Sequence, residues 1–186
     1  TACGACEPGS GPCGSECLGD EVYVETAYIT PGTATGGAWI LGRPTTRFTY
    51  GDPAGPRTET QTRYDGPAFE GLPLGQLTDG LATMVRERLD DSSWVFTQRV
   101  AYDDDGNVVE ELSPTGSPDV TTNDRRRITY DDLGIRVVRV EDLFHDGDDQ
   151  PVSLRREYTY ESAFYAVSEA TSWMLVRDGA AVTPRN

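Results

Sequence analysis

The sequence contains no lysine, a single histidine (His145) and no cysteine after residue 17. All 16 strongly basic residues are therefore arginine, and 31 acidic residues bring the formal net charge to −15. An acidic surface disfavours nucleic acid and anionic membranes as partners, since both carry the same sign of charge. One histidine gives a catalytic triad only one possible base, and no nucleophile-elbow sequence accompanies it. We therefore expect no enzymatic activity.

Long apolar runs are also missing. No stretch approaches the roughly 18 apolar residues that a membrane-spanning helix needs, and no basic-then-apolar signal sequence is present. The chain begins at Thr1 rather than at methionine, so we expect a fragment or a processed product. The sequence thus predicts no membrane span.

Hydrophobic residues make up 37% of the chain, against about 45–50% in typical globular domains, a range that also counts glycine. Three Trp, nine Tyr and five Phe compensate, because each aromatic side chain buries a large area. A chain of 186 residues can hold one core or a large piece of a bigger one. We expect an ordered protein.

Residues 1–20 contain every cysteine, spaced C-x2-C-x6-C-x3-C among glycine, proline and serine. Four thiolates suit a tetrahedral Zn²⁺ ion, for which a C-x2-C pair is the usual half-site. Two disulfides are the alternative, with three possible pairings. Either arrangement predicts a stapled N-terminal knob over residues 1–20, followed by a β-sheet region over residues 21–186. The candidate zinc ligands are Cys3, Cys6, Cys13 and Cys17.

Short alternating runs bounded by Gly, Pro, Asp and Asn predict antiparallel strands throughout the rest of the chain. Residues 81–89 fit a helix or a strand, and Thr83 and Val85 favour the strand. The expected fold class is all-β. The predicted strands are 21–30, 38–41, 45–50, 58–64, 81–89, 93–103, 108–112, 126–131, 136–143, 152–160 and 171–176.

Four of these strands end alike: an apolar residue, then Thr or Ala, then Tyr, at residues 47–50, 99–102, 127–130 and 157–160. Tyr102 and Tyr130 continue into turns rich in Asp and Gly. A recurring unit with one apolar face needs stacked neighbours to bury it. We expect the tyrosines to pack in a ladder and the aspartates to bind turn amides. The alternative is a set of unrelated hairpins in one β-sandwich.

Residues 63–76 mix three Gly and two Pro with Phe69, Leu72 and Leu74. Gly costs about 1 kcal/mol and Pro about 3 kcal/mol in a helix interior, so a helix is excluded. The apolar side chains exclude a solvated linker. The composition predicts a tightly turned, ordered crossing where backbones approach closely.

These motifs resemble a known family. Tyr-Asp-x-x-Gly-Asn at 102–107 and Tyr-Asp-x-x-Gly at 130–134 resemble the YD repeats of RHS/YD-repeat proteins. Residues 64–76 are more closely similar to a segment of insecticidal toxin-complex B subunits and their RHS-like relatives, and residues 158–165 to a further element of that group. The resemblance covers residues 45–176. The residues that carry it are Tyr64, Asp65, Gly66, Phe69, Gly71, Leu72, Pro73, Gly75, Tyr102, Asp103, Gly106, Tyr130, Asp131 and Gly134.

In that family a strip of β-sheet spirals into a hollow shell that encloses a toxic polypeptide. The resemblance implies a structural role in such a shell, whose partners are its other parts and the enclosed toxin, and a secreted or cell-surface location. A free-standing extracellular β-domain that binds a protein or a glycan is the alternative function. A hydrolase that uses two carboxylates is a third hypothesis, although nothing among the 31 acidic residues selects a pair.

Overall fold

The computed structural model describes residues 22–30, 42–51, 55–90, 92–116, 124–145, 151–161, 166–171, 173–177 and 180–181. These residues form one antiparallel sheet of twelve strands and no helix, which confirms the predicted all-β class. The strands are β1 (Tyr23–Tyr28), β2 (Pro44–Tyr50), β3 (Thr58–Tyr64), β4 (Ala82–Arg88), β5 (Trp94–Tyr102), β6 (Val108–Leu112), β7 (Arg125–Tyr130), β8 (Val137–His145), β9 (Pro151–Tyr160), β10 (Val167–Ala170), β11 (Met174–Arg177) and β12 (Ala180–Ala181).

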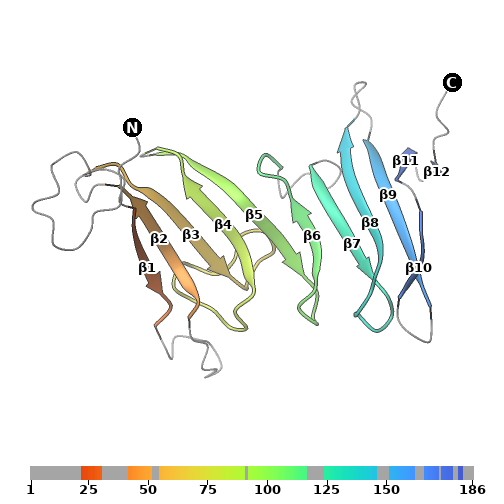
Figure 1. Ribbon diagram of the computed structural model, residues 1–186, viewed down its shortest axis with the longest axis horizontal. Helices are drawn as coiled ribbons and strands as arrows, with labels where there is room; N and C mark the ends of the chain where they lie inside the picture. The colour runs from red at the N-terminus through yellow and green to blue at the C-terminus, as the bar shows by residue number, and fades with distance from the viewer. Residues whose placement is uncertain are drawn as a thin grey trace, which may run out of the picture.

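The sheet is a meander in which each strand from β1 to β9 pairs with the next one along the chain (Figure 1). Two strands share the far edge of β9: β11 pairs with residues 152–155, and β10 with residues 158–160. Finally, β12 pairs with β11. Neighbouring strands are thus nearly always neighbours in sequence, as in consecutive hairpins.

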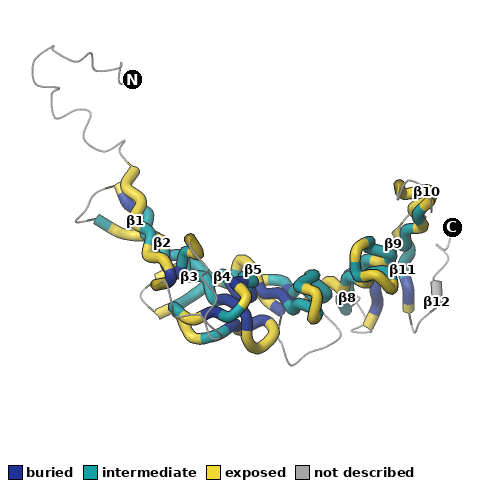
Figure 2. Tube along the Cα trace, turned by 90° about the horizontal axis from the view of Figure 1, so that it is seen from below, coloured by how far each residue is buried: buried dark blue, intermediate teal, exposed yellow. Residues whose placement is uncertain are grey.

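The sheet is a single layer that bows into an arc (Figure 2). Cross-strand register places Arg63, Met84 and Arg99 on one face, and Ile128 and Val140 on the opposite face. The layer is thickened on its convex side at β3, β4 and β5 (Figure 2). We call the face that carries Met84 the convex face, and the face that carries Ile128 the concave face.

The thickening is the connection between β3 and β4, which crosses the convex face. The Phe69 amide donates to the Val100 carbonyl on β5, 3.0 Å away, and the Phe69 ring lies 5.5 Å from the guanidinium of Arg125 on β7. Leu77 is fully buried and packs with Ile29 and Tyr64. The predicted ordered crossing therefore occupies residues 65–81 and supplies the main apolar cluster of the described residues.

The structure refines several predicted boundaries. Residues 82–88 form a strand, as favoured over a helix. Two short strands, β10 and β12, were not predicted, because four residues in β10 and two in β12 are too few to show an alternation in the sequence. The predicted strand at 38–41 and the cysteine-rich residues 1–20 lie outside the described residues.

The crossing returns to β3 so closely that Gly71 has no room for a side chain. Its φ is +69°, and an added Cβ would lie 2.8 Å from the Cβ of Arg63. Gly75 shares the left-handed conformation, with φ +86°, but an added Cβ there would have nothing within 4 Å. A comparison of alanine substitutions at the two glycines therefore distinguishes the cost of backbone strain from the cost of steric overlap.

We predict that Gly71→Ala lowers the free energy of unfolding by about 2–4 kcal/mol, since it adds overlap to backbone strain. The control Gly75→Ala should cost only the strain, about 1–2 kcal/mol. Urea unfolding of both variants measures the difference. Equal losses would contradict the close approach of the crossing to β3.

Candidate functional site: a row of tyrosine turns

Five strands end in tyrosine at one edge of the sheet. In each case the amide of the next residue donates to the carbonyl of the residue that precedes the following strand. This bond closes the connection, whatever its length. The five bonds are Ile29 to Arg43 at 2.9 Å, Asp65 to Leu81 at 2.7 Å, Asp103 to Asn107 at 3.0 Å, Asp131 to Arg136 at 2.8 Å and Glu161 to Ala166 at 2.9 Å.

A β-bulge lies beside every one of these tyrosines. The tyrosine pairs with the first residue of the following strand, and the second residue of that strand is skipped in the register. Bulges bend a strand and increase its local twist, so bulges repeated at one edge fit the arc of Figure 2. The skipped residues are Thr45, Thr83, Val109, Val138 and Ser168.

The hydroxyl groups of four tyrosines tie the same edge together. Each donates to the backbone carbonyl of the first residue of the preceding strand: Tyr64 to Pro44 at 2.7 Å, Tyr102 to Ala82 at 2.9 Å, Tyr130 to Val108 at 3.2 Å and Tyr160 to Val137 at 2.7 Å. Burial raises the pKa of the Tyr64, Tyr102 and Tyr130 hydroxyls. They therefore remain neutral donors at physiological pH.

Tyr28 holds the corresponding place at the end of β1, but the residue is 58% exposed. In the described part of the chain no strand precedes β1, so the row offers no carbonyl for its hydroxyl. Among the described residues the row of tyrosines therefore begins on β1, two strands before Tyr64 on β3, the first tyrosine that forms such a bond.

An aspartate follows three of the tyrosines and caps the turn, as the sequence predicts. Asp103 Oδ1 accepts from the amides of Asp105 at 3.1 Å and Asn107 at 2.8 Å. Asp131 accepts from the amides of Ile135 at 3.0 Å and Arg136 at 3.2 Å, and from Arg136 Nε at 2.6 Å. These hydrogen bonds lower the pKa of Asp131 to about 2, and the bond from the Ile135 amide has the largest effect.

Asp65 performs the same task for the long crossing. Its carboxylate accepts from four successive amides, those of Thr78, Asp79, Gly80 and Leu81, at 2.6–3.1 Å. Burial raises the pKa of Asp65, but the four hydrogen bonds outweigh it, and the net pKa lies below the ordinary value. The crossing thus ends in a capped turn of the same kind.

Neighbouring turns also contact one another. Asn107 Nδ2 donates to the Gly134 carbonyl of the next turn at 2.9 Å. An added Cβ at Gly134 would lie 3.0 Å from Asp105 Oδ2, and one at Gly106 would meet the Leu81 side chain at 3.7 Å. We call the tyrosines, their capping residues and these glycines the tyrosine-turn row.

Arginine–carboxylate pairs join the strands away from this edge. The run 125–127 forms cross-strand ion pairs: Arg125 to Glu110 at 3.0 Å, Arg126 to Asp142 at 2.6 Å and Arg127 to Glu110 at 2.9 Å. The Arg125 side chain is only 3% exposed. Further pairs join Arg139 to Glu157 at 3.1 Å and Arg155 to Glu141 at 2.8 Å.

The structure brings the predicted motif tyrosines, the aspartates that follow them, Gly106 and Gly134 into one row, with one correction. Tyr50 was aligned with Tyr102, Tyr130 and Tyr160, but it ends β2 at the opposite edge and contacts Glu25. The alignment was wrong for Tyr50 because four residues of sequence do not show in which direction the strand runs, and so at which edge of the sheet its last residue lies. Tyr28 was missed because Ile29, not Asp, follows it.

The remaining motif residues lie in the crossing. Gly66 has φ +71°, and Phe69 is buried. The Leu72 amide donates to the Tyr64 carbonyl at 2.8 Å, and the Pro73 carbonyl accepts from the Gln76 amide at 3.0 Å. Sequence reasoning missed Leu77, the fully buried side chain, although it stands at the end of the same Gly- and Leu-rich stretch.

The predicted zinc or disulfide site, Cys3, Cys6, Cys13 and Cys17, lies outside the described residues. Within the described ranges no group of three or more His, Cys, Asp or Glu side chains could hold a metal ion. The same ranges contain no helix able to cross a membrane. Comparison of the chain with protein-family models, curated proteins and solved structures finds no match.

We predict that Tyr102→Phe lowers the free energy of unfolding by about 0.5–1.5 kcal/mol, because it removes one hydrogen bond without changing the ring. Tyr158→Phe is the matched control, since the Tyr158 hydroxyl makes no hydrogen bond within the described residues and its loss should be nearly neutral. Thermal and urea unfolding compare the two. A loss for Tyr158→Phe as large as for Tyr102→Phe would argue against the tyrosine-turn row.

We predict that Asp131→Asn destabilises the protein at neutral pH and progressively less in acid. The pKa of Asp131 falls from 3.8 to about 2 on folding. Its stabilising contribution is therefore complete above about pH 5 and is lost as the pH falls through 2. Unfolding midpoints of both proteins should converge between pH 5 and 2. Asp132→Asn, at an exposed position with no described side-chain hydrogen bond, should show no such convergence.

Proposed function

We propose that the chain is a structural section of an RHS/YD-repeat-type shell, related to the shells of toxin-complex B subunits, which encapsulates or presents a toxin polypeptide. The observation that carries this proposal is the tyrosine-turn row: one closure, one bulge and one tyrosine recur every two strands along a single-layer meander. A repeated unit of this kind extends in one dimension, because each unit contacts only its neighbours.

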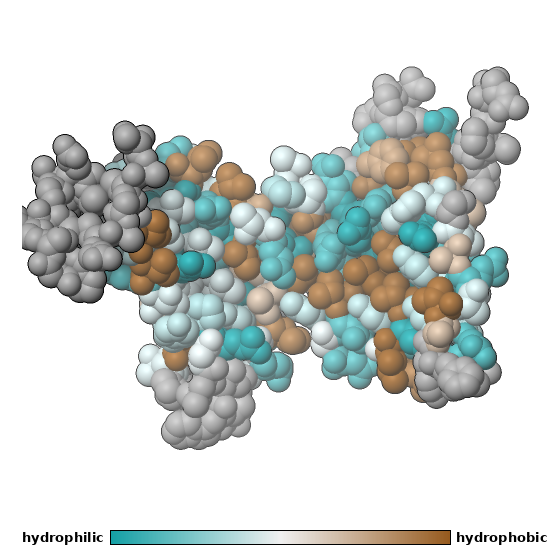
Figure 3. Space-filling model, in the orientation of Figure 1, coloured by the Kyte–Doolittle hydropathy of each residue, from teal (hydrophilic) through white to brown (hydrophobic). Residues whose placement is uncertain are grey.

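The single layer supports a wall rather than an isolated domain. Hydrophobic side chains gather on the concave face over β6 to β9 (Figure 3), where Ile128, Val140 and Leu154 are only half-buried. A globular domain would cover such a face with a second layer. A hollow wall leaves it for an enclosed polypeptide, with about 25 cal/mol of stabilisation for each Å² of apolar surface covered.

Tyr28 supports continuation of the wall beyond β1. Its four counterparts each bind the first carbonyl of a preceding strand. The exposed tyrosine at β1 is what the first described unit of a longer row would present. The proposed partners are accordingly other parts of the shell and the enclosed toxin, and the proposed location is secreted or cell-surface.

Protease protection of the natural full-length protein tests whether the sheet is part of a shell that encloses a polypeptide. Encapsulation predicts a polypeptide that survives protease while the shell is folded and is degraded once the shell is opened by mild denaturant. Tyr102→Phe combined with Tyr130→Phe should lower the denaturant concentration at which protection is lost, because two hydroxyl–carbonyl hydrogen bonds between strands are removed. Tyr158→Phe should leave that concentration unchanged.

An absence of any protected polypeptide would refute encapsulation. If the 186-residue chain alone is a monomer that unfolds cooperatively and binds a protein or glycan, the free-standing domain is the better description. Electron microscopy of the full-length protein adds a direct view, since a shell must show a closed wall around a cavity.

A further inference from the structure

Three arginines border a recess of about 260 Å³ on the convex face, beneath the crossing. Arg63 comes from β3, Arg86 from β4 and Arg99 from β5, and Phe69, Met84 and Phe96 supply apolar walls. The volume exceeds that of one water molecule, about 30 Å³ in the liquid, several times. The recess can therefore hold a small polar group together with the atoms that carry it.

These arginines differ from the arginines farther along the convex face. Between β6 and β9, each arginine on the convex face pairs with a cross-strand carboxylate, as Arg127 does with Glu110 and Arg155 with Glu141. No ion pair joins Arg63, Arg86 or Arg99 to a carboxylate of the described residues. The recess thus gathers positive charge in a strongly acidic chain.

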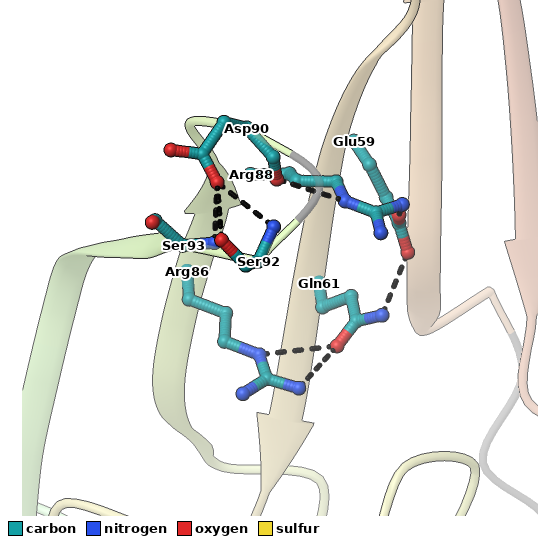
Figure 4. A network of polar contacts seen from close by, with 7 residues as sticks. All are labelled: Glu59, Gln61, Arg86, Arg88, Asp90, Ser92 and Ser93. Carbon is teal, nitrogen blue, oxygen red and sulfur yellow. Dashed lines mark hydrogen bonds and ion pairs between the residues drawn. The ribbon is translucent and has the colours of Figure 1, made fainter.

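Figure 4 shows the difference beside the recess. Arg88 reaches the Glu59 carboxylate at 3.0 Å, whereas Arg86 donates hydrogen bonds to the Gln61 amide oxygen, at 2.8 and 3.1 Å. The Arg86 guanidinium also lies 4.3 Å from the centre of the Trp94 ring, an apolar contact that supplies no anion. Gln61 in turn donates to Glu59 at 2.7 Å. The Glu59 carboxylate is therefore already engaged by Arg88 and Gln61.

The other two guanidinium groups are also incompletely satisfied. Arg99 is only 7% exposed, and its Nη2 donates to the Ser113 and Gly116 carbonyls. The Nε atoms of Arg99 and Arg63 are buried without an acceptor. A buried charge without an anion is costly, so a bound anion would stabilise this part of the sheet.

The electrostatics agree with the geometry. Burial lowers the pKa of Arg86, the positive charge of Arg63 lowers it further, and Glu59 partly offsets this. Glu70 also lines the recess, but it is exposed and forms no ion pair among the described residues. The recess therefore repels cations and favours an anion.

We propose that the recess formed by Arg63, Arg86 and Arg99 binds a carboxylate group. The planar guanidinium fork matches a carboxylate, and the sheet uses this pairing wherever its convex-face arginines are satisfied. The carboxylate comes from a free small acid or from an acidic side chain of a polypeptide. This assignment does not rest on the proposed shell, and the two can fail separately.

Calorimetric titration of the full chain tests the site with citrate, with a short peptide containing one Glu, and with the same peptide carrying Gln. Citrate or the Glu peptide should bind, and the Gln peptide should not. Arg63→Gln and Arg86→Gln should each weaken binding about ten-fold or more, as expected for loss of a charge-assisted bond. Arg86→Lys keeps the positive charge but loses the planar guanidinium group. Its affinity for the carboxylate should lie between that of the two Gln variants and that of the original protein.

Arg155→Gln is the matched control, because it removes the same charge from the same face but from a satisfied pair. It should change binding by less than about two-fold. Circular dichroism establishes that each variant is folded. Binding of the peptide alone identifies a polypeptide carboxylate, and binding of citrate alone a free acid. No binding by either, tighter binding of inorganic phosphate, or an equal loss in Arg155→Gln would overturn the proposal.

Discussion

A sheet of one layer has no interior between two packed faces, so its strands must be held together mainly along their own edges. The tyrosine-turn row meets this constraint at one edge. The closing amide bond joins the two ends of each connection, the bulge bends the strand, and the tyrosine hydroxyl links the strand end to the start of the preceding strand. Each device uses backbone carbonyls or amides, so it tolerates different side chains in the strands between.

The two faces of the layer have different chemistry. The convex face carries the crossing and most of the arginine–carboxylate pairs, including the nearly buried pair of Arg125 and Glu110. The concave face carries a gathering of hydrophobic side chains over β6 to β9 (Figure 3). The strand register places the half-buried Val140 on this face. Pairs of opposite charge directly across strands stabilise a sheet without a second layer. An apolar face gains only when something covers it, which is why the concave face is the one we assign to a cargo.

Much of this arrangement could be predicted from the sequence. Period-two alternation and Asp-Gly turns gave nearly every strand, and the Asp after Tyr predicted the capped turns correctly. Strand direction could not be predicted from a tetrapeptide, so Tyr50 was placed in the wrong row. The recess was also beyond reach, because Arg63, Arg86 and Arg99 are brought together only by the register of three strands. Nothing in their sequence spacing distinguishes them from the paired arginines.

The crossing is best understood as an insertion into one turn of the row. Asp65 and Leu81 close it with the same amide–carbonyl bond that joins Asp103 to Asn107 in a short turn. Because the row requires only this closure, which the Asp65 carboxylate caps here, the chain between the two ends can acquire another task. Here that chain folds back over the convex face, and Phe69 becomes a wall of the arginine recess. The row thus fixes the architecture, while a single enlarged turn creates the most distinctive surface of the molecule.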